Sequence, residues 1–142
     1  MSDPVRNVPV LTYDAAAALM HEAIRHARSN GWSVACAVVD PWGQILASGR
    51  MDGVAPAVLE FAADKAYTSA PGRTTKGFFE RMSSSGDLTL GLGNRPRLCA
   101  WEGGLPIRCS GVLVGAMGVS GAAGHEDAAC GQAALEKLGL GT

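Results

Sequence analysis

The stretch that decides the fold is WEGGLPIRCSGVLVGAMGVSG, residues 101–121. A glycine pair at 103–104 and a Ser-Gly pair at 110–111 bound two apolar runs. Apolar runs separated by turn residues predict a β-hairpin. We expect residues 105–109 to pair with residues 112–119. The second run is apolar at both alternating sets of positions, apart from its glycines, so it should be a buried strand in the middle of a sheet.

Helical and strand-like segments surround this hairpin. Thr12 is suited to cap a helix and Gly31 to end it. The predicted helices span residues 13–30, 55–69, 74–82 and 125–138, and the other predicted strands span residues 32–39, 44–50 and 98–101. Strands joined by tight turns, with helices segregated from them, indicate an α+β fold with a five-stranded antiparallel sheet flanked by helices.

The first predicted helix has one apolar stripe at helical spacing. Its members are Tyr13, Ala16, Ala17, Met20, Ile24 and Ala27. Residues 1–10, which include two prolines, should form an N-terminal arm, and residues 11–142 a single domain. Residues 83–97 are polar and rich in glycine without a clear period, which predicts a long functional or mobile loop.

The composition limits the possible functions. Of the 142 residues, 47% are apolar and 18% are charged, and a charged fraction below about 25% suggests that part of the surface is buried against another subunit. A net charge of −1 argues against binding to nucleic acid or to a membrane surface.

The four cysteines form no C-x-x-C pair and are expected to be buried thiols. With no apolar run of about 20 residues and no signal-peptide pattern, we expect a cytoplasmic protein.

Residues 118–124, between the last predicted strand and the last helix, are mostly glycine and other small residues. Backbone N–H groups at such a position can bind a phosphate or a carboxylate. The segment matches neither the phosphate-loop nor the dinucleotide-binding pattern. Glu126 and Asp127 follow it and would repel an anion at the start of the helix. A tight strand-to-helix turn is therefore favoured over an anion site.

Two side chains are candidates for a catalytic base. Glu102 precedes the Gly103–Gly104 pair, whose N–H groups could stabilise a developing negative charge, although a solvated turn glutamate fits this spacing equally well. Lys65 lies beside the apolar stripe of its predicted helix, near Tyr67. Such a lysine either occupies a pocket or extends to solvent, and extension to solvent is the commoner case.

The three histidines show no metal-binding pattern. His21 and His26 share a helix but lie about 140° apart around its axis, so they cannot bind one metal ion or one haem within a subunit. His125 opens the last predicted helix, where a ligand or base is possible and an exposed histidine is the simpler interpretation. We predict no metal site.

Four segments together resemble the GlcG/HbpS haem-binding-like family, which includes the C-terminal domain of PduO-type proteins. They are AVVDPWGQILASGRMDG (37–53), KAYTSA (65–70), GGLPIRCSGVLVGAMGVSG (103–121) and EDAACGQAALEKLG (126–139). The resemblance runs from about Leu11 to Leu138. It implies a profilin-like or PAS-like sandwich and a homo-oligomer built from dimers into tetramers or octamers. It also implies a role in small-molecule catabolism, and some members bind or degrade haem.

The resemblance implies ligand-binding positions that match the shared motifs. With His125 added from the sequence itself, the candidates are Arg50, Tyr67, Gly103, Gly104, Pro106, Gly121 and His125. The haem ligand is not part of the shared motif. This chain also departs from the pattern at Trp42, where a small residue is common, and at Glu102, where a proline or small residue is usual.

Two functions follow as hypotheses. In the first, the protein is an accessory protein of a catabolic pathway that binds haem or a small organic ligand. In the second, it is a small enzyme without a cofactor, such as a hydrolase, isomerase or tautomerase acting on a small organic acid. Glu102 or Lys65 would then be the base and the Gly103–Gly104 backbone the hydrogen-bond donor.

Overall fold

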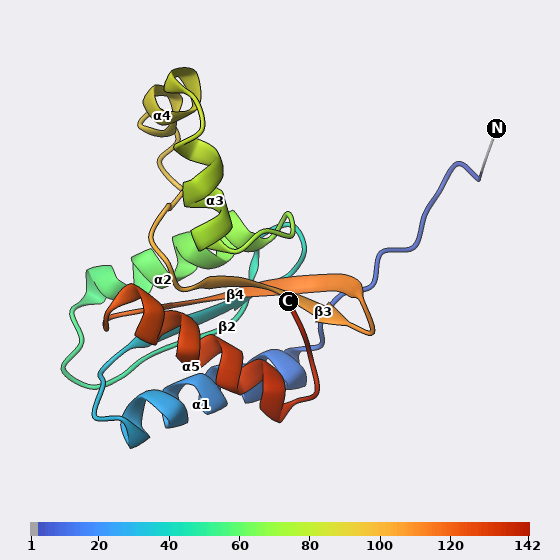
Figure 1. Ribbon diagram of the computed structural model, residues 1–142. Coiled ribbons are helices and arrows are strands. Elements are labelled where there is room, and N and C mark those ends of the chain that lie inside the picture. Colours follow the sequence, from blue (N-terminus) through green and yellow to red (C-terminus); the bar gives the residue numbers. More distant parts are fainter. Residues whose placement is uncertain (1–2) are drawn as a thin grey trace.

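A four-stranded antiparallel sheet with helices on both faces forms the centre of the computed structural model, which describes residues 3–142 (Figure 1). In chain order the elements are α1 (Tyr13–Ser29), β1 (Ala35–Val39), β2 (Ile45–Arg50), α2 (Pro56–Ser69), α3 (Thr75–Met82), α4 (Gly86–Leu92), β3 (Gly104–Cys109), β4 (Val112–Ser120) and α5 (Gly124–Lys137). The strand order is β2-β1-β4-β3. The predicted α+β class is confirmed and β4 lies in the middle of the sheet as expected, but the sheet has four strands and not the five predicted.

The predicted hairpin is formed by β3 and β4. Leu105 pairs with Met117, and Cys109 pairs with Val112 across a two-residue turn. The turn residues Ser110 and Gly111 have φ angles of 50° and 81°. Positive φ at both positions is what a type I′ turn requires, and this turn matches the natural twist of a hairpin.

The sheet separates two apolar clusters. Helices α1 and α5 lie side by side over one face (Figure 1), where Leu19, Val38 and Leu135 are fully buried. Helix α2 covers the opposite face with small residues such as Ala62 and Ala66. These small residues let the backbone of α2 lie directly on β4, one of the two inner strands.

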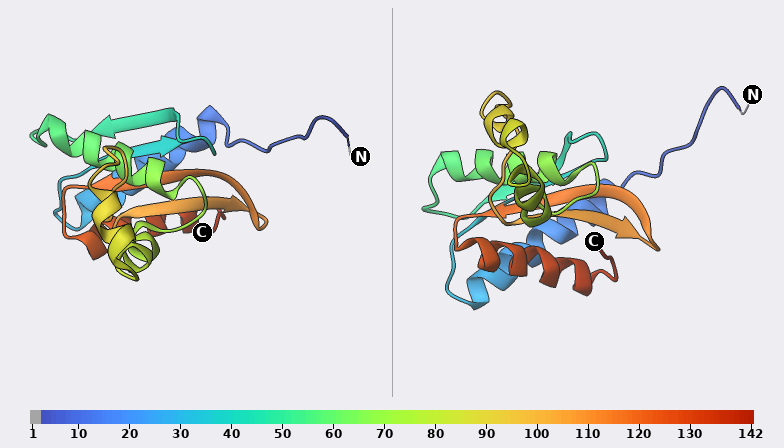
Figure 2. Two further views of the ribbon diagram at one scale, coloured as in Figure 1. Left: turned by 90° about the horizontal axis from the view of Figure 1, so that it is seen from above. Right: turned by 45° about the horizontal axis from the view of Figure 1, so that its top comes forward.

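Two sequence-based predictions about residues 83–101 are wrong. Residues 98–101 form no strand, because the chain there is bonded to Thr68 of α2: the Cys99 N–H donates to Oγ1 of Thr68 at 2.9 Å. The predicted loop contains the helix α4, which buries none of its residues. With α3, it projects away from the sheet as an arm over residues 75–92 (Figure 2).

The N-terminal segment from residue 3 to residue 10 contains no helix or strand and extends away from the body of the protein (Figure 2). Residues 1 and 2 of the predicted arm lie outside the described residues. The segment joins the body at Leu11, whose N–H donates to the carbonyl oxygen of Val114 at 3.0 Å.

Among the described residues, no helix has the length and hydrophobicity needed to cross a membrane.

Candidate functional site

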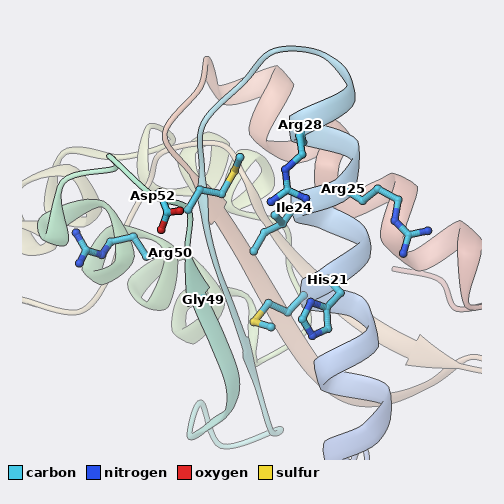
Figure 3. Close-up of a pocket in the computed structure, with 9 residues that line it drawn as sticks. His21, Ile24, Arg25, Arg28, Gly49, Arg50 and Asp52 are labelled. Atoms are coloured by element: carbon cyan, nitrogen blue, oxygen red, sulfur yellow. The ribbon is translucent and has the colours of Figure 1, made fainter.

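A groove of about 430 Å³ lies between α1 and the end of the edge strand β2 (Figure 3). Its helix side comes from residues at helical spacing on α1, and its strand side from residues 49–52. The lining residues are Met20, His21, Ile24, Arg25, Arg28, Gly49, Arg50, Met51 and Asp52. The groove therefore combines an imidazole, two thioethers and several charged groups.

The apolar stripe predicted for α1 divides between the core and this groove, except for Tyr13, which is exposed. The helix residues that are fully buried are Ala16, Leu19, Ala23 and Ala27. Met20 and Ile24 are only partly buried and line the groove. A side chain at Gly49 would place its Cβ 2.9 Å from the sulfur of Met20, so the absence of a side chain there lets the Met20 thioether lie over β2. Sequence reasoning missed this groove because it treated Met20 and Ile24 only as members of one apolar stripe.

The arginines around the groove differ in their orientation (Figure 3). Arg28 lies beside Ile24 between the helix and the strands, whereas Arg25 points away from the strands and pairs with Glu22 at 3.2 Å. Arg50, a predicted ligand-binding residue, donates to the carbonyl oxygen of Val54 at 2.6 Å. Arg28 is thus the guanidinium best placed to meet an anionic group in the groove.

The histidines are separated as their spacing predicts. His21 is exposed and lines the groove, while the ring of His26 packs edge-on against Trp32 with a centroid distance of 6.0 Å. His125 is exposed at the start of α5 and does not line the groove. Within residues 3–142, no three His, Cys, Asp or Glu side chains come together in a way that could hold a metal ion.

Lys65 occupies a buried site and does not extend to solvent, contrary to the commoner case for such a lysine. Its ammonium donates to the carbonyl oxygen of Val119 at 2.9 Å and to Oδ2 of Asp127 at 3.1 Å. Burial raises the pKa of Asp127, and the Lys65 ammonium and the Ala122 N–H offset part of this effect. This environment favours a structural role, and the use of Lys65 as a base stays a prediction.

The Gly103–Gly104 pair is buried beside this ion pair. A Cβ at Gly103 would lie 2.9 Å from the ammonium nitrogen of Lys65. The Gly104 N–H already donates to Oγ1 of Thr75 at 2.9 Å, so in this conformation it is not available as a donor to a ligand. Pro106 is buried in β3, and Glu102 is half-buried against Gly124. The roles of these residues in binding or catalysis stay predictions.

The turn between β4 and α5 satisfies its own backbone donors. The Ala122 N–H donates to Oδ1 of Asp127 at 2.9 Å, and the Ala123 N–H donates to Oε1 of Glu126 at 3.1 Å. Gly121 adopts a φ of 125° in this turn. The predicted strand-to-helix turn is present, and these two carboxylates accept from N–H groups that would otherwise face an anion.

The sequence of this chain also matches known proteins. The family model described as "Haem degrading protein HbpS-like" matches residues 11–136. Protein GlcG of Escherichia coli strain K12 is 37% identical over 111 residues, which are 78% of this chain and 81% of GlcG.

Two solved structures share the fold. A double mutant of HbpS from Streptomyces reticuli has a TM-score of 0.86 and 28% identity, over 97% of this chain and 93% of that chain. The structure titled as a PduOC:heme complex has a TM-score of 0.82 and 22% identity, over 94% of this chain and 98% of that chain, and this likeness shows the fold alone. The match of the family model to residues 11–136, together with the identity to GlcG, shows that the chain belongs to the HbpS-like family.

Proposed function

We propose that the protein binds haem in the groove between α1 and β2, with His21 as the ligand of the iron. The observation that carries the proposal is the exposed imidazole of His21 in a groove that also presents Met20, Ile24 and Arg28. Imidazole is a common axial ligand of haem iron. The family description "Haem degrading protein HbpS-like" supports the same ligand.

The other residues of the groove suit the remaining parts of a haem. Ile24 and the thioether of Met20 offer apolar contact to a flat macrocycle, and the guanidinium of Arg28 can pair with a propionate carboxylate. The sulfur of Met51 accepts from the Val34 N–H at 3.3 Å and is therefore less suited to be a ligand than that of Met20. Bound haem would supply redox and oxygen chemistry, and the chain would supply ligation and orientation. An accessory role in a catabolic pathway follows from the family resemblance and is part of this proposal.

A hemin titration tests the proposal. The wild-type protein is expected to give a saturable shift of the Soret band with a stoichiometry of one hemin per chain. His21→Ala should abolish this shift, and Arg28→Gln should weaken binding by roughly 10-fold, as loss of one charge-assisted contact implies. His26→Ala is the matched control, since His26 lies on the same helix but packs against Trp32. Unchanged hemin binding by His21→Ala would refute the assignment.

Self-association is a second part of the proposal. The arm formed by α3 and α4 exposes 53% of Phe79 and 81% of Leu90. Large apolar side chains at this exposure, on a chain with only 18% charged residues, suit contact with another copy of the chain. We therefore place a contact between subunits on this arm.

A further inference from the structure

A separate open pocket of about 420 Å³ lies beside α2 and is lined by Tyr67, Leu98 and the exposed residues Arg95, Pro96 and Arg97. We call it the tyrosine–arginine pocket. Its volume is in the range of pockets that bind small molecules. It shares no lining residue with the groove that contains His21, so a ligand here would be independent of the proposed haem.

Hydrogen bonds to α2 hold one wall of this pocket. Oγ1 of Thr68 accepts from the Cys99 N–H at 2.9 Å and donates to the carbonyl oxygen of Arg97 at 3.4 Å. Thr68 is itself buried. The segment that carries Arg95 and Arg97 is therefore fixed to the helix that carries Tyr67, although it forms no strand.

The turn between β1 and β2 packs directly against the ring of Tyr67. Gly43 has a φ of 83°, and a Cβ at this position would lie 2.5 Å from Cδ2 of Tyr67. Only glycine combines this backbone conformation with the space that the ring occupies. Oδ1 of Asp40 accepts from the N–H groups of Trp42 and Gln44 at 2.9 and 3.0 Å, which holds the turn in this shape. The position of Tyr67 is thus determined by residues outside the pocket.

Tyr67 in turn positions Arg97. The guanidinium carbon of Arg97 lies 3.8 Å from the centre of the Tyr67 ring, a cation–π contact that occupies one face of the guanidinium. Its N–H donors project from the edges of the plane, where they can meet a carboxylate in a bidentate pair. The nearest carboxylate oxygen, on Asp64, lies 4.0 Å from Nε of Arg97, which is too far for a strong hydrogen bond.

We propose that the tyrosine–arginine pocket binds a small organic monocarboxylate, with Arg97 pairing with the carboxylate and Pro96 and Leu98 contacting the apolar body of the ligand. Arg95 adds a second positive charge to the same wall. Asp64 near Arg97 disfavours ligands with several negative charges, such as phosphate. The site recognises its ligand by one planar guanidinium and a neighbouring apolar surface.

Benzoate is a suitable probe, because it combines one carboxylate with a rigid apolar ring. Calorimetric titration of the full chain with benzoate should show saturable binding of one molecule per chain. Benzamide, which has the same shape without the charge, should bind far more weakly. Arg97→Gln should reduce the benzoate affinity by roughly 10- to 100-fold, which corresponds to loss of a hydrogen-bonded charge pair.

Arg97→Lys should also lose most of the affinity, since lysine keeps the charge but not the planar pair of donors. Arg81→Gln on α3 is the matched control and should bind benzoate as the wild type does, because Arg81 is exposed and does not line the pocket. The folded state of each variant is checked by its thermal melting curve.

Three results would overturn the proposal: no saturable binding of benzoate, equal affinity in Arg97→Gln and the wild type, or equal affinity for inorganic phosphate and benzoate. The last result would show a non-selective anion site. His21→Ala should leave benzoate binding unchanged, and Arg97→Gln should leave hemin binding unchanged. Failure of one site is therefore distinguishable from failure of the other.

Discussion

The ammonium of Lys65 on α2 and the carboxylate of Asp127 on α5 form an ion pair at 3.1 Å, with only 2% and 3% of their side chains exposed. The pair connects elements on opposite sides of the sheet and lies against Gly103, which precedes β3. A third group, the carbonyl oxygen of Val119, accepts from the same ammonium. The ammonium and the carboxylate therefore lie together at one polar position inside an otherwise apolar interior.

Loss of one partner from this pair should destabilise the protein strongly. Asp127→Ala leaves a buried ammonium without its counter-charge, which typically costs about 3–5 kcal/mol. Urea unfolding followed by circular dichroism measures the loss. The control is Glu22→Gln, which removes the pair of the partly buried Glu22 with the exposed Arg25 and should cost about 1 kcal/mol. Similar losses in the two variants would contradict the structural importance of the buried pair.

Gly118 should not tolerate a side chain. A Cβ there would clash with the carbonyl oxygen of Ala62 and lie 2.7 Å from the backbone nitrogen of Ala66, both in the backbone of α2, which cannot move like a flexible side chain. We expect Gly118→Ala to lower the free energy of unfolding by about 1–3 kcal/mol or more. Gly91→Ala in α4 is the control, because a Cβ at Gly91 meets no atom within 4 Å and alanine favours a helix by up to about 1 kcal/mol. A neutral Gly118→Ala would show that α2 can move away from the sheet.

The four thiols should react at very different rates. Cys36 and Cys130 are buried, as predicted, but Cys99 is half-buried and Cys109 is exposed, so the expectation of buried thiols is wrong for Cys109. A disulfide-exchange reagent at about pH 8 should modify Cys109 first and leave Cys36 and Cys130 unmodified until the protein unfolds. Peptide mass spectrometry identifies the modified sites. Rapid modification of Cys36 in the folded protein would contradict this packing.

Stability should fall at alkaline pH through the two buried thiols. Burial raises the pKa of Cys36 from 9.0 to about 12 and that of Cys130 from 9.0 to about 11. Above pH 9 the unfolded chain loses these protons while the folded chain keeps them, so the free energy of unfolding decreases as the pH rises toward these values. Urea unfolding at about pH 8 and about pH 10.5 should show a smaller decrease for Cys36→Ala than for the wild type. An equal decrease in both proteins would assign the effect to other groups.

A charge on the projecting arm should weaken self-association. Leu90→Lys places an ammonium where 81% of an apolar side chain is exposed, and we expect sedimentation velocity to show a smaller assembly for this variant. Lys137→Gln on α5 is an exposed control outside the arm and should sediment as the wild type does. If the Leu90→Lys variant sediments as an assembly of wild-type size, the contact between subunits lies elsewhere.

Local patterns in the sequence predict the parts of the fold that depend on neighbouring residues. The β3–β4 hairpin and the cap of α1 are of this kind: Oγ1 of Thr12 accepts from the Ala15 N–H at 3.2 Å. The predicted fifth strand failed because Thr68, some 30 positions earlier, supplies the hydrogen bonds that a neighbouring strand would have made. Helix α4 was missed because it buries no face, and its sequence therefore shows no apolar stripe at helical spacing.

The candidate site was predictable only in part. Arg50 was a candidate from the family motif, whereas the sequence did not single out His21 as a ligand. The groove exists because Gly49 allows Met20 to lie over β2. The proximity of Lys65 and Asp127, 62 positions apart, depends on how both helices pack on the sheet. Tyr67 was predicted to bind a ligand from the family motif alone. Its contact with Arg97 adds a residue that no pattern in the sequence indicated.

The pairing of β1 with β4 in the centre of the sheet has a consequence for how this fold can vary. Ala35 pairs with Ser120 and Val39 with Ala116, so β2, α2, the α3–α4 arm and β3 all lie in the chain between two adjacent strands. Helix α4 of this arm buries none of its residues and takes no part in the strand register. The length and sequence of α4 can therefore change without altering the sheet, the groove at α1 or the ion pair, and a related chain can acquire new partners by changing α4. Thr75 at the start of α3 is not free in this way, because its Oγ1 accepts from the Gly104 N–H of β3.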